Sequence, residues 1–270
     1  MRVWTKVVSK LHIIKSNRLN KKNNKLKHED FKIHIYYRTS DKGYPKDKPD
    51  YITSYNCLKN ALDRFNPSDV DWHIMCDNCC EETMKWIYEL CDKYGVKREN
   101  VYEVSVGHGA GTFRLVYEKS LSLPDNDVVY FLENDYLHRK ESLQALKNAF
   151  SKTLCDYATL YDHPDKYEDN YLYSAYYKDS RAYYDGEFFW QKILSTTMTF
   201  ASRVRTLKKD KKYFWRWTNT KHPYDLYIFI DLRRHHRLMI SPIPGLSTHG
   251  ERAYLSPNVD WAKEVIADEQ

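Results

Sequence analysis

The feature that most constrains the fold is an alternation, from Phe31 onward, of segments with a strand pattern and segments with a helix pattern. Short apolar runs rich in β-branched and aromatic residues predict strands at residues 32–38, 71–77, 100–106 and 128–135. Between them apolar residues recur every three or four positions and predict helices, the first carrying Tyr55, Leu58, Leu62 and Phe65. This alternation predicts an α/β domain whose mostly parallel sheet is covered by helices on both faces.

Further helices are expected at 81–94, ended by Gly95, at 113–122 and at 143–150. In open α/β sheets, ligands bind beyond the carboxyl ends of the strands. We therefore expect one ligand-binding rim, formed by the loops that follow Arg38, Asp77, Val106 and Leu132.

The regular alternation of strand and helix patterns ends after Cys155. Residues 167–190 are dense in aromatic side chains, and a shorter strand is predicted at 195–201. The lysine-rich segment 207–213 reads as a basic turn, 221–236 as a helix and 239–244 as another short strand.

The net charge of +6 is unevenly distributed. Residues 1–28 hold nine of the 43 Lys and Arg residues and no acid, so the remainder has 34 basic against 37 acidic residues, a formal charge of −3. We expect a basic leader of a helix plus a linker at 1–28, and a single folded domain at 29–270. The leader helix either docks on the domain or makes peripheral contact with an anionic membrane.

Six cysteines are too few for a disulfide scaffold at this length, which favours the cytoplasm. The sequence shows neither a membrane-spanning apolar stretch nor a secretory signal. The group CDNCC at 76–80 supplies one clear cysteine pair, whereas structural zinc sites usually have two, so zinc is disfavoured.

Two carboxylates, Glu133 and Asp135, end the strand at 128–135 and lie two positions apart, which places them on one face. Oxygen ligands on the ligand-binding rim suit a hard divalent cation such as Mn²⁺ or Mg²⁺. Alternatively, Glu133 caps the next helix and Asp135 faces water. His249, after a short apolar strand, is a candidate third ligand or phosphate contact.

Asp225 is expected at the start of a helix, where it either caps the helix or acts as a general base. Asp185 and Glu187 compete for the role of base. The segment HGAGTFR at 108–114 is similar to a backbone cradle for phosphate, because its glycines allow close approach and a helix N-terminus follows. Arg114 is a candidate phosphate partner there.

The order of these features resembles that of nucleotide-sugar-dependent glycosyltransferases with the GT-A fold, most closely their small virus-encoded and bacterial members. An acid-x-acid strand end, a later strand, an aspartate that opens a helix and a histidine after a short strand carry this resemblance, over roughly residues 32–250. It implies a nucleotide-binding part at about 31–137 and an acceptor part at about 155–270.

The resemblance implies that Asp135, His249 and Glu133 hold the divalent ion and that Asp225 is the catalytic base of an inverting transfer. Where the family's commonest pattern is DxD this chain has ENDY, and Tyr224 stands in place of the acid that usually precedes the base. The resemblance further implies a nucleotide sugar as donor, commonly UDP-linked and with xylose among the candidate sugars. The implied nucleotide-sugar contacts are Tyr37, Arg38, Thr39, Asp77, Gly109, Thr112, Arg114, Glu133 and Asn134.

The acceptor is expected to be an oligosaccharide or a glycoprotein, because aromatic rings stack on the apolar faces of sugars. Candidate acceptor contacts are Tyr184, Asp185, Trp190 and Trp217, although each ring also suits ordinary packing. If the chain is viral, the expected location is the host cytoplasm.

Three rival interpretations stay open at this point. The basic leader and the abundant aromatics are typical of nucleic-acid-binding proteins, but the acidic body argues against a nucleic-acid partner. A glycoside hydrolase would use a carboxylate pair such as Asp185 and Glu187. A sugar nucleotidyltransferase would share the need for a nucleotide and a metal.

Overall fold

A nine-stranded sheet runs through the computed structural model, which describes residues 30–43, 46–168 and 182–266. The strand order is β3-β2-β1-β4-β9-β6-β10-β8-β7. Within it, only β8 and β9 run opposite to the other strands. The strands are β1 (Ile33–Ser40), β2 (Asp71–Asp77), β3 (Val101–Val104), β4 (Val128–Glu133), β6 (Tyr157–Ala158), β7 (Ala182–Tyr184), β8 (Phe189–Lys192), β9 (Phe200–Arg203) and β10 (Met239–Ile243).

The chain order reverses beside β1. From β1 the chain proceeds outward through β2 to β3 and then returns to place β4 on the other side of β1. The two connections leave the carboxyl ends of β1 and β4 in opposite directions, which opens a crevice between them. This crevice is the expected place for a ligand.

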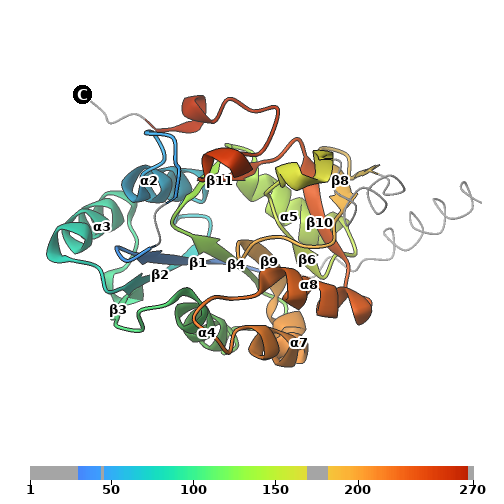
Figure 1. The fold of residues 1–270 in the computed structure, drawn as a ribbon, viewed down its shortest axis with the longest axis horizontal. Coiled ribbons are helices and arrows are strands. Elements are labelled where there is room, and N and C mark those ends of the chain that lie inside the picture. Colours follow the sequence, from blue (N-terminus) through green and yellow to red (C-terminus); the bar gives the residue numbers. More distant parts are fainter. Residues whose placement is uncertain (1–29, 44–45, 169–181, 267–270) are drawn as a thin grey trace, which may run out of the picture.

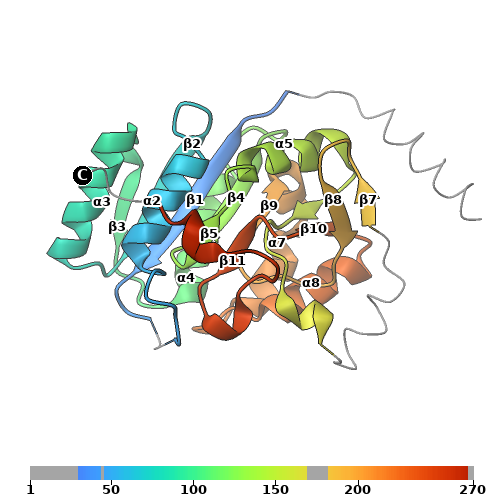
Figure 2. The same ribbon diagram turned by 90° about the horizontal axis from the view of Figure 1, so that it is seen from above.

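Helices cover both faces of the sheet, as Figures 1 and 2 show. One face carries α2 (Ser54–Arg64), α3 (Glu81–Tyr94) and α5 (Ser142–Lys152), and the other carries α4 (Gly109–Ser120), α7 (Val204–Trp217) and α8 (Asp225–Arg234). A small second sheet pairs β5 (Tyr136–His138) with β11 (Ser247–His249). Short 3₁₀ helices lie at Arg98–Asn100, Pro164–Tyr167, Arg252–Tyr254 and Trp261–Glu264.

The two faces of the central strands fill two separate hydrophobic cores. Along β4, Tyr130 and Leu132 pack with α2, α3 and α5, whereas Val129 and Phe131 pack with α4, α7 and α8. Alternate residues of a strand point to opposite faces, so a strand buried on both sides must be apolar throughout. The apolar run before Glu133 therefore identifies a central strand.

The α/β fold class is confirmed, and so are the first four strands and the helices that follow them, with small shifts of their bounds. Gly95 ends α3 at a φ of 80°, which its missing Cβ permits. The helix expected at 113–122 begins four residues earlier, at Gly109, and the strand expected from 195 begins at Phe200.

One prediction is wrong: residues 207–213 are not a turn but the middle of α7. Their lysines lie on a helix whose other side buries Leu207, Tyr213 and Phe214. The strands β5 and β11 were not expected either, since segments of three residues are too short to show a period.

The basic leader at 1–28 lies outside the described residues, and the proposed division of 29–270 into two parts stays a prediction. Of the helices in the described ranges, none has both the length and the apolar character that a membrane span requires.

Candidate functional site

A cavity of about 740 Å³ lies at the carboxyl edge of the sheet, where the crevice between β1 and β4 opens. The strand ends of β1, β2 and β4 line it, together with the N-terminal ends of α4 and α8 and the end of β11. Most of the residues predicted for the site line this cavity: Arg38, Thr39, Asp77, Gly109, Thr112, Glu133, Asn134, Asp135, Asp225 and His249.

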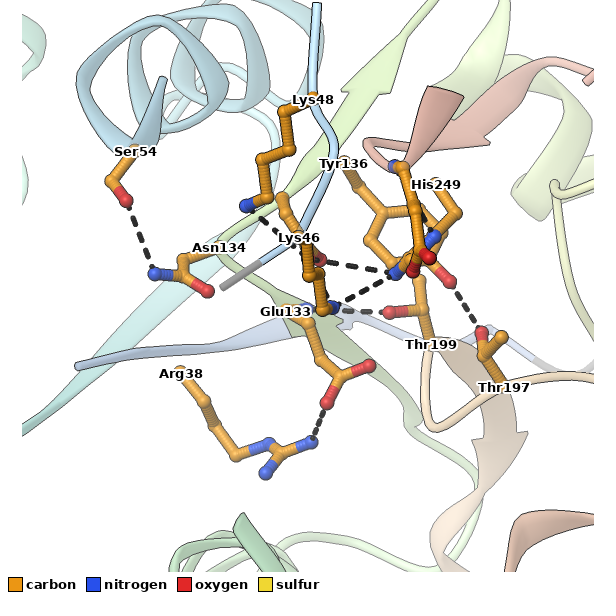
Figure 3. A network of polar contacts seen from close by, with 12 residues as sticks. Arg38, Lys46, Lys48, Ser54, Glu133, Asn134, Tyr136, Thr197, Thr199 and His249 are labelled. Atoms are coloured by element: carbon orange, nitrogen blue, oxygen red, sulfur yellow. Dashed lines mark hydrogen bonds and ion pairs between the residues drawn. The ribbon is translucent and has the colours of Figure 1, made fainter. Parts of the chain in front are cut away.

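Arg38 ties three elements together at the floor of the cavity. Its guanidinium donates to the Glu133 carboxylate at 2.9 Å (Figure 3) and to the Gly109 carbonyl oxygen at 3.0 Å. Arg38 is 6% exposed, so the pair is shielded from water on the Arg38 side. The Glu133 carboxylate is thus committed to a guanidinium, and the structure does not place it with Asp135 as a metal ligand.

Asp77 organises the loop between β3 and α4. Its carboxylate accepts hydrogen bonds from the backbone N–H groups of Val106 at 2.7 Å and Gly107 at 2.9 Å. Gly107 has a φ of 80°, a conformation that a side chain would strain. This arrangement fixes the turn that brings the N-terminus of α4 to the cavity.

The N-terminus of α4 faces the cavity and is capped by the His108 side chain. The His108 side chain accepts a hydrogen bond from the backbone N–H of Gly111 at 3.0 Å, and the Thr112 hydroxyl donates to the His108 carbonyl oxygen at 2.8 Å. Helix N-termini attract anions because their N–H dipoles point outward. The segment expected to cradle phosphate therefore lies where a phosphate could bind.

Asn134 and Thr39 line the cavity between β1 and α2. The Asn134 amide donates to the Thr39 hydroxyl and to the Ser54 hydroxyl, each at 3.2 Å. These three polar side chains provide hydrogen-bond donors and acceptors along one edge of the cavity.

A second cluster forms around Asp135, and Figure 3 labels its members Lys46, Lys48 and His249. The pairing of β5 with β11 places His249 opposite Tyr136 and beside Asp135, with 3.5 Å between His249 Nε2 and Asp135 Oδ2. The Lys46 ammonium lies 2.7 Å from Asp135 Oδ2 and 3.1 Å from His249 Nε2. Lys48 Nζ approaches the same carboxylate oxygen at 3.5 Å.

The charge state of this cluster follows from its burial. Burial lowers the pKa of the His249 imidazole to about 4 despite the neighbouring Asp135 carboxylate, so the imidazole is neutral at pH 7. Burial would raise the pKa of Asp135, but His249, Lys46 and Lys48 outweigh it and hold that pKa at about 2. Because His249 carries no charge at neutral pH, we attribute the stabilisation of the carboxylate there to the two lysines.

Asp135 and His249 fit a divalent cation as a pair of donors. A carboxylate oxygen and an imidazole nitrogen converge on one point, and a hard cation with two protein ligands keeps positions for diphosphate oxygens and water. Within the described ranges no group of three His, Cys, Asp or Glu side chains is arranged around a metal position. Two of the three predicted metal ligands are therefore brought together, and Glu133 is not.

Asp225 is the first residue of α8, as expected, and accepts a hydrogen bond from the Leu226 N–H at 2.7 Å. Burial, helped by the negative charge of Glu133, raises the pKa of its carboxyl to about 6. A carboxylate with such a pKa is ionised at pH 7 and is a stronger base than an ordinary aspartate.

Asp225 also lines a second cavity of about 190 Å³. Thr197, His163 and Asp225 line both cavities, so the smaller one adjoins the larger beside the candidate base. His163, Asp165 and Lys166 line the smaller cavity with Asp225, and the residues before Asp225 that line the larger cavity include Lys221 and His222.

Several predicted residues do not line either cavity within the described part of the chain. Tyr37 is buried in the core, and Arg114 donates to Thr218 and to the Trp215 carbonyl oxygen, which joins α4 to α7. The carboxylate of Asp185 holds its own turn and accepts from the indole N–H of Trp190, which is buried.

Tyr184 is 58% exposed on β7, and the indole of Trp217 donates to Asp231. The four acceptor assignments, Tyr184, Asp185, Trp190 and Trp217, stay predictions without support from the cavity.

The sequence analysis missed Lys46, Lys48 and His163. The loop that follows the first strand is rich in lysine and lies on the expected rim, which was the signal available for the first two. No local pattern marks His163, which follows β6 and reaches the cavity through the long-range packing of the sheet.

No protein-family model matches this sequence, and no curated protein matches it. Among solved structures, GalNAc-T7 with UDP, GalNAc and Mn²⁺ is similar at a TM-score of 0.56 and 9% identity, covering 85% of this chain and 46% of that one. TarS 1–349 of S. aureus in complex with UDP has a TM-score of 0.46 at 12% identity, covering 83% and 59%. This chain thus spans less than two thirds of the length of either.

The similarity to GalNAc-T7 concerns the fold. Together with the sheet order and the covering helices, it shows that this chain has the α/β fold of GT-A glycosyltransferases. The virus-encoded or bacterial detail of the resemblance has no support here and stays a prediction.

Proposed function

We propose that this chain is an inverting glycosyltransferase that moves a sugar from a UDP-linked donor to a hydroxyl group of a glycan. The observation that carries the proposal is that one cavity is lined both by Asp225, a carboxyl with a pKa raised to about 6, and by the convergent pair Asp135 and His249. GalNAc-T7, which shares the fold, was solved with UDP, GalNAc and Mn²⁺.

The nucleotide diphosphate is proposed to lie across the crevice between β1 and β4. The helix N-terminus at Gly109 and the ammonium groups of Lys46 and Lys48 give this region a favourable potential for phosphate oxygens. The polar edge formed by Thr39, Ser54 and Asn134 is available to the nucleoside or its ribose.

Asp135 and His249 are the residues that would hold Mn²⁺ or Mg²⁺. When bound, such an ion acts as a Lewis acid that neutralises the charge developing on the leaving diphosphate. The protein contributes the placement of the two donors, which the β5–β11 pairing fixes.

Asp225 is proposed to remove the proton of the acceptor hydroxyl as its oxygen attacks the anomeric carbon. The bond from that carbon to the diphosphate breaks as the new bond forms, so a single attack from the opposite face inverts the configuration. Because the 190 Å³ cavity begins at Asp225 and is lined by polar side chains, we place a sugar ring there.

The observed contacts of Asp185 and Glu187 disfavour the hydrolase alternative. Asp185 accepts from two backbone N–H groups and an indole, and Glu187 accepts from Asn148 at 3.0 Å. A pair of carboxylates already engaged in this way is poorly placed to act as acid and base on a glycosidic bond. The cytoplasmic setting, based on cysteine usage, remains part of the proposal.

The test is a panel of nucleotide sugars that includes UDP-xylose, incubated with the protein and Mn²⁺ and then with EDTA, with release of the nucleoside diphosphate measured. We expect turnover of one donor that depends on the metal. A panel in which no donor binds or turns over would overturn the proposed function, and equal turnover with EDTA would overturn its metal dependence. Salt-dependent binding of RNA or DNA without donor turnover would instead favour a nucleic-acid-binding protein.

A further inference from the structure

The Lys46 ammonium occupies the point on which Asp135 and His249 converge. It lies 2.7 Å from Asp135 Oδ2 and 3.1 Å from His249 Nε2, and Figure 3 shows the contact with His249. Asp135 and His249 are 5% and 8% exposed, so their polar atoms have little access to water. A buried carboxylate without a positive partner is costly, and Lys46 removes that cost in the protein as it stands.

The contact uses the atoms that a metal ion would need. A lysine ammonium has only hydrogens to donate, so a hydrogen bond between the two requires the His249 tautomer whose Nε2 carries the lone pair. That lone pair and Asp135 Oδ2 are also the two donors available for a divalent cation. An ammonium and a metal ion cannot share them at hydrogen-bonding and coordination distances at once.

We propose that Lys46 and a divalent cation are alternative occupants of the Asp135–His249 pair, so that metal enters only as the Lys46 side chain leaves. The inference rests on the metal-binding part of the proposed function and adds the residue that regulates it. The Lys46 side chain already lines the 740 Å³ cavity, and it can leave the pair by rotating toward that cavity.

The charges around the pair specify when the exchange is favourable. Asp135 contributes one negative charge, Lys46 and Lys48 contribute two positive charges, and the nearby Arg38–Glu133 pair is neutral in sum. A lone divalent cation therefore meets a net positive site, whereas the negative charge of a diphosphate favours both the metal and the displaced ammonium. The free protein is expected to bind metal weakly, and the nucleotide-bound protein tightly.

The experiment measures Mn²⁺ binding to the full chain without nucleotide, from the loss of the free Mn²⁺ signal in electron paramagnetic resonance. Lys46→Met is expected to lower the dissociation constant by at least on the order of tenfold, because a positive charge leaves the site and both donors are freed. Lys42→Met is the matched control: it removes the same charge from the same cavity at a residue for which no contact with Asp135 occurs in the described structure. It should change the constant by less than about twofold.

Two further variants test the assignment of the site. Lys46→Arg keeps the charge and should leave Mn²⁺ binding weak, and adding Asp135→Asn to Lys46→Met should abolish the tight binding. Circular dichroism melting confirms that each variant is folded. An equal Mn²⁺ affinity for Lys46→Met and wild type would overturn the inference.

A second measurement needs no variant. A crystal of the wild-type protein soaked in Mn²⁺ is expected to show the ion between Asp135 and His249 with Lys46 Nζ moved beyond hydrogen-bonding distance. An ion bound there with the Lys46 contact intact would overturn the inference. Because neither experiment contains a nucleotide sugar, a failure of donor turnover and a failure of this exchange remain separate results.

Discussion

The Arg38 guanidinium and the Glu133 carboxylate bridge the crevice between β1 and β4, with 2.9 Å between Arg38 Nη2 and Glu133 Oε1. The same guanidinium donates to the Gly109 carbonyl oxygen, so one side chain joins two strand ends to the start of α4. Arg38 thus sets the geometry of the floor on which the diphosphate is proposed to lie.

The first prediction concerns this bridge. Arg38→Met is expected to lower the free energy of unfolding by about 1–3 kcal/mol, because the partly exposed Glu133 carboxylate and the Gly109 carbonyl oxygen lose their hydrogen-bond donor. Urea unfolding followed by fluorescence measures the change, and calorimetric titration with UDP is expected to show weaker binding.

Arg98→Met is the control for loss of an arginine ion pair, because Arg98 and Asp92 are each more than half exposed on the surface. It should leave the unfolding midpoint unchanged within error. If the two variants change the free energy of unfolding to the same extent, the Arg38–Glu133 pair contributes no more than an exposed ion pair and does not organise the crevice.

The second prediction is the pH dependence of transfer. Asp225 must be ionised to accept a proton, and its pKa is raised to about 6 by burial and by Glu133, so kcat/KM should rise with pH through about 6 and then level. Asp225→Asn should reduce kcat by about a hundredfold or more while UDP binding is retained. Glu187→Gln is the control and should keep both the rate and the pH profile.

The third prediction concerns stability, which should fall as the pH rises, whereas the transfer rate should rise. The folded-state pKa of Asp225 lies above its unfolded value of 3.8, so its contribution to stability is fully present below about pH 4 and is lost as the pH rises through about 6. Asp225→Asn cannot ionise, and at pH 7 it should be more stable than wild type by on the order of 1–3 kcal/mol.

Denaturant unfolding at pH 4 and at pH 7 tests this prediction. The advantage of the variant should be near zero at pH 4 and should develop by pH 7. An advantage that does not change with pH would mean that the carboxyl is not destabilised by its surroundings.

The sheet was predictable from sequence wherever burial dictates composition. β4 is covered on both faces, which forces a continuous apolar run, and Gly95 marks the end of α3 through its conformation. The helix α7 was missed because the lysines of its exposed side dominate the local sequence, and its buried residues depend on a core formed by distant strands.

The candidate site was predictable where the residues that line the cavity stand at strand and helix ends. Glu133, Asp135 and Asp225 follow or begin elements that the pattern identifies. The partners of these residues could not be predicted, because Lys46 lies 89 residues from Asp135 and Arg38 lies 95 residues from Glu133 in the sequence. Such pairs arise from the register of the fold, which no local spacing encodes.

The fourth prediction uses the tight packing behind the Asp135–His249 pair. A Cβ at Gly250 would lie 2.5 Å from Ile52 Cγ2 and 2.8 Å from the Asp135 carbonyl oxygen. Gly250→Ala should therefore displace Asp135, cost about 1–3 kcal/mol of stability and reduce transfer. At Gly43, which lines the same cavity, a Cβ meets nothing within 4 Å, so Gly43→Ala should leave the thermal midpoint nearly unchanged. Equal effects in the two variants would contradict this prediction.

The fifth prediction concerns Thr196, which lines the 190 Å³ cavity beside Asp225. Its hydroxyl is buried and has no hydrogen-bond partner among the described residues, although buried hydroxyls normally have one. In the proposed complex a sugar hydroxyl supplies that partner, so Thr196→Val, which keeps the shape, should lower kcat/KM by about tenfold. Stability should be unchanged, because no protein partner is lost. The control is Thr206→Val on α7, which lines neither cavity and should keep wild-type kinetics. Wild-type kinetics in the Thr196→Val variant would exclude a sugar from the 190 Å³ cavity.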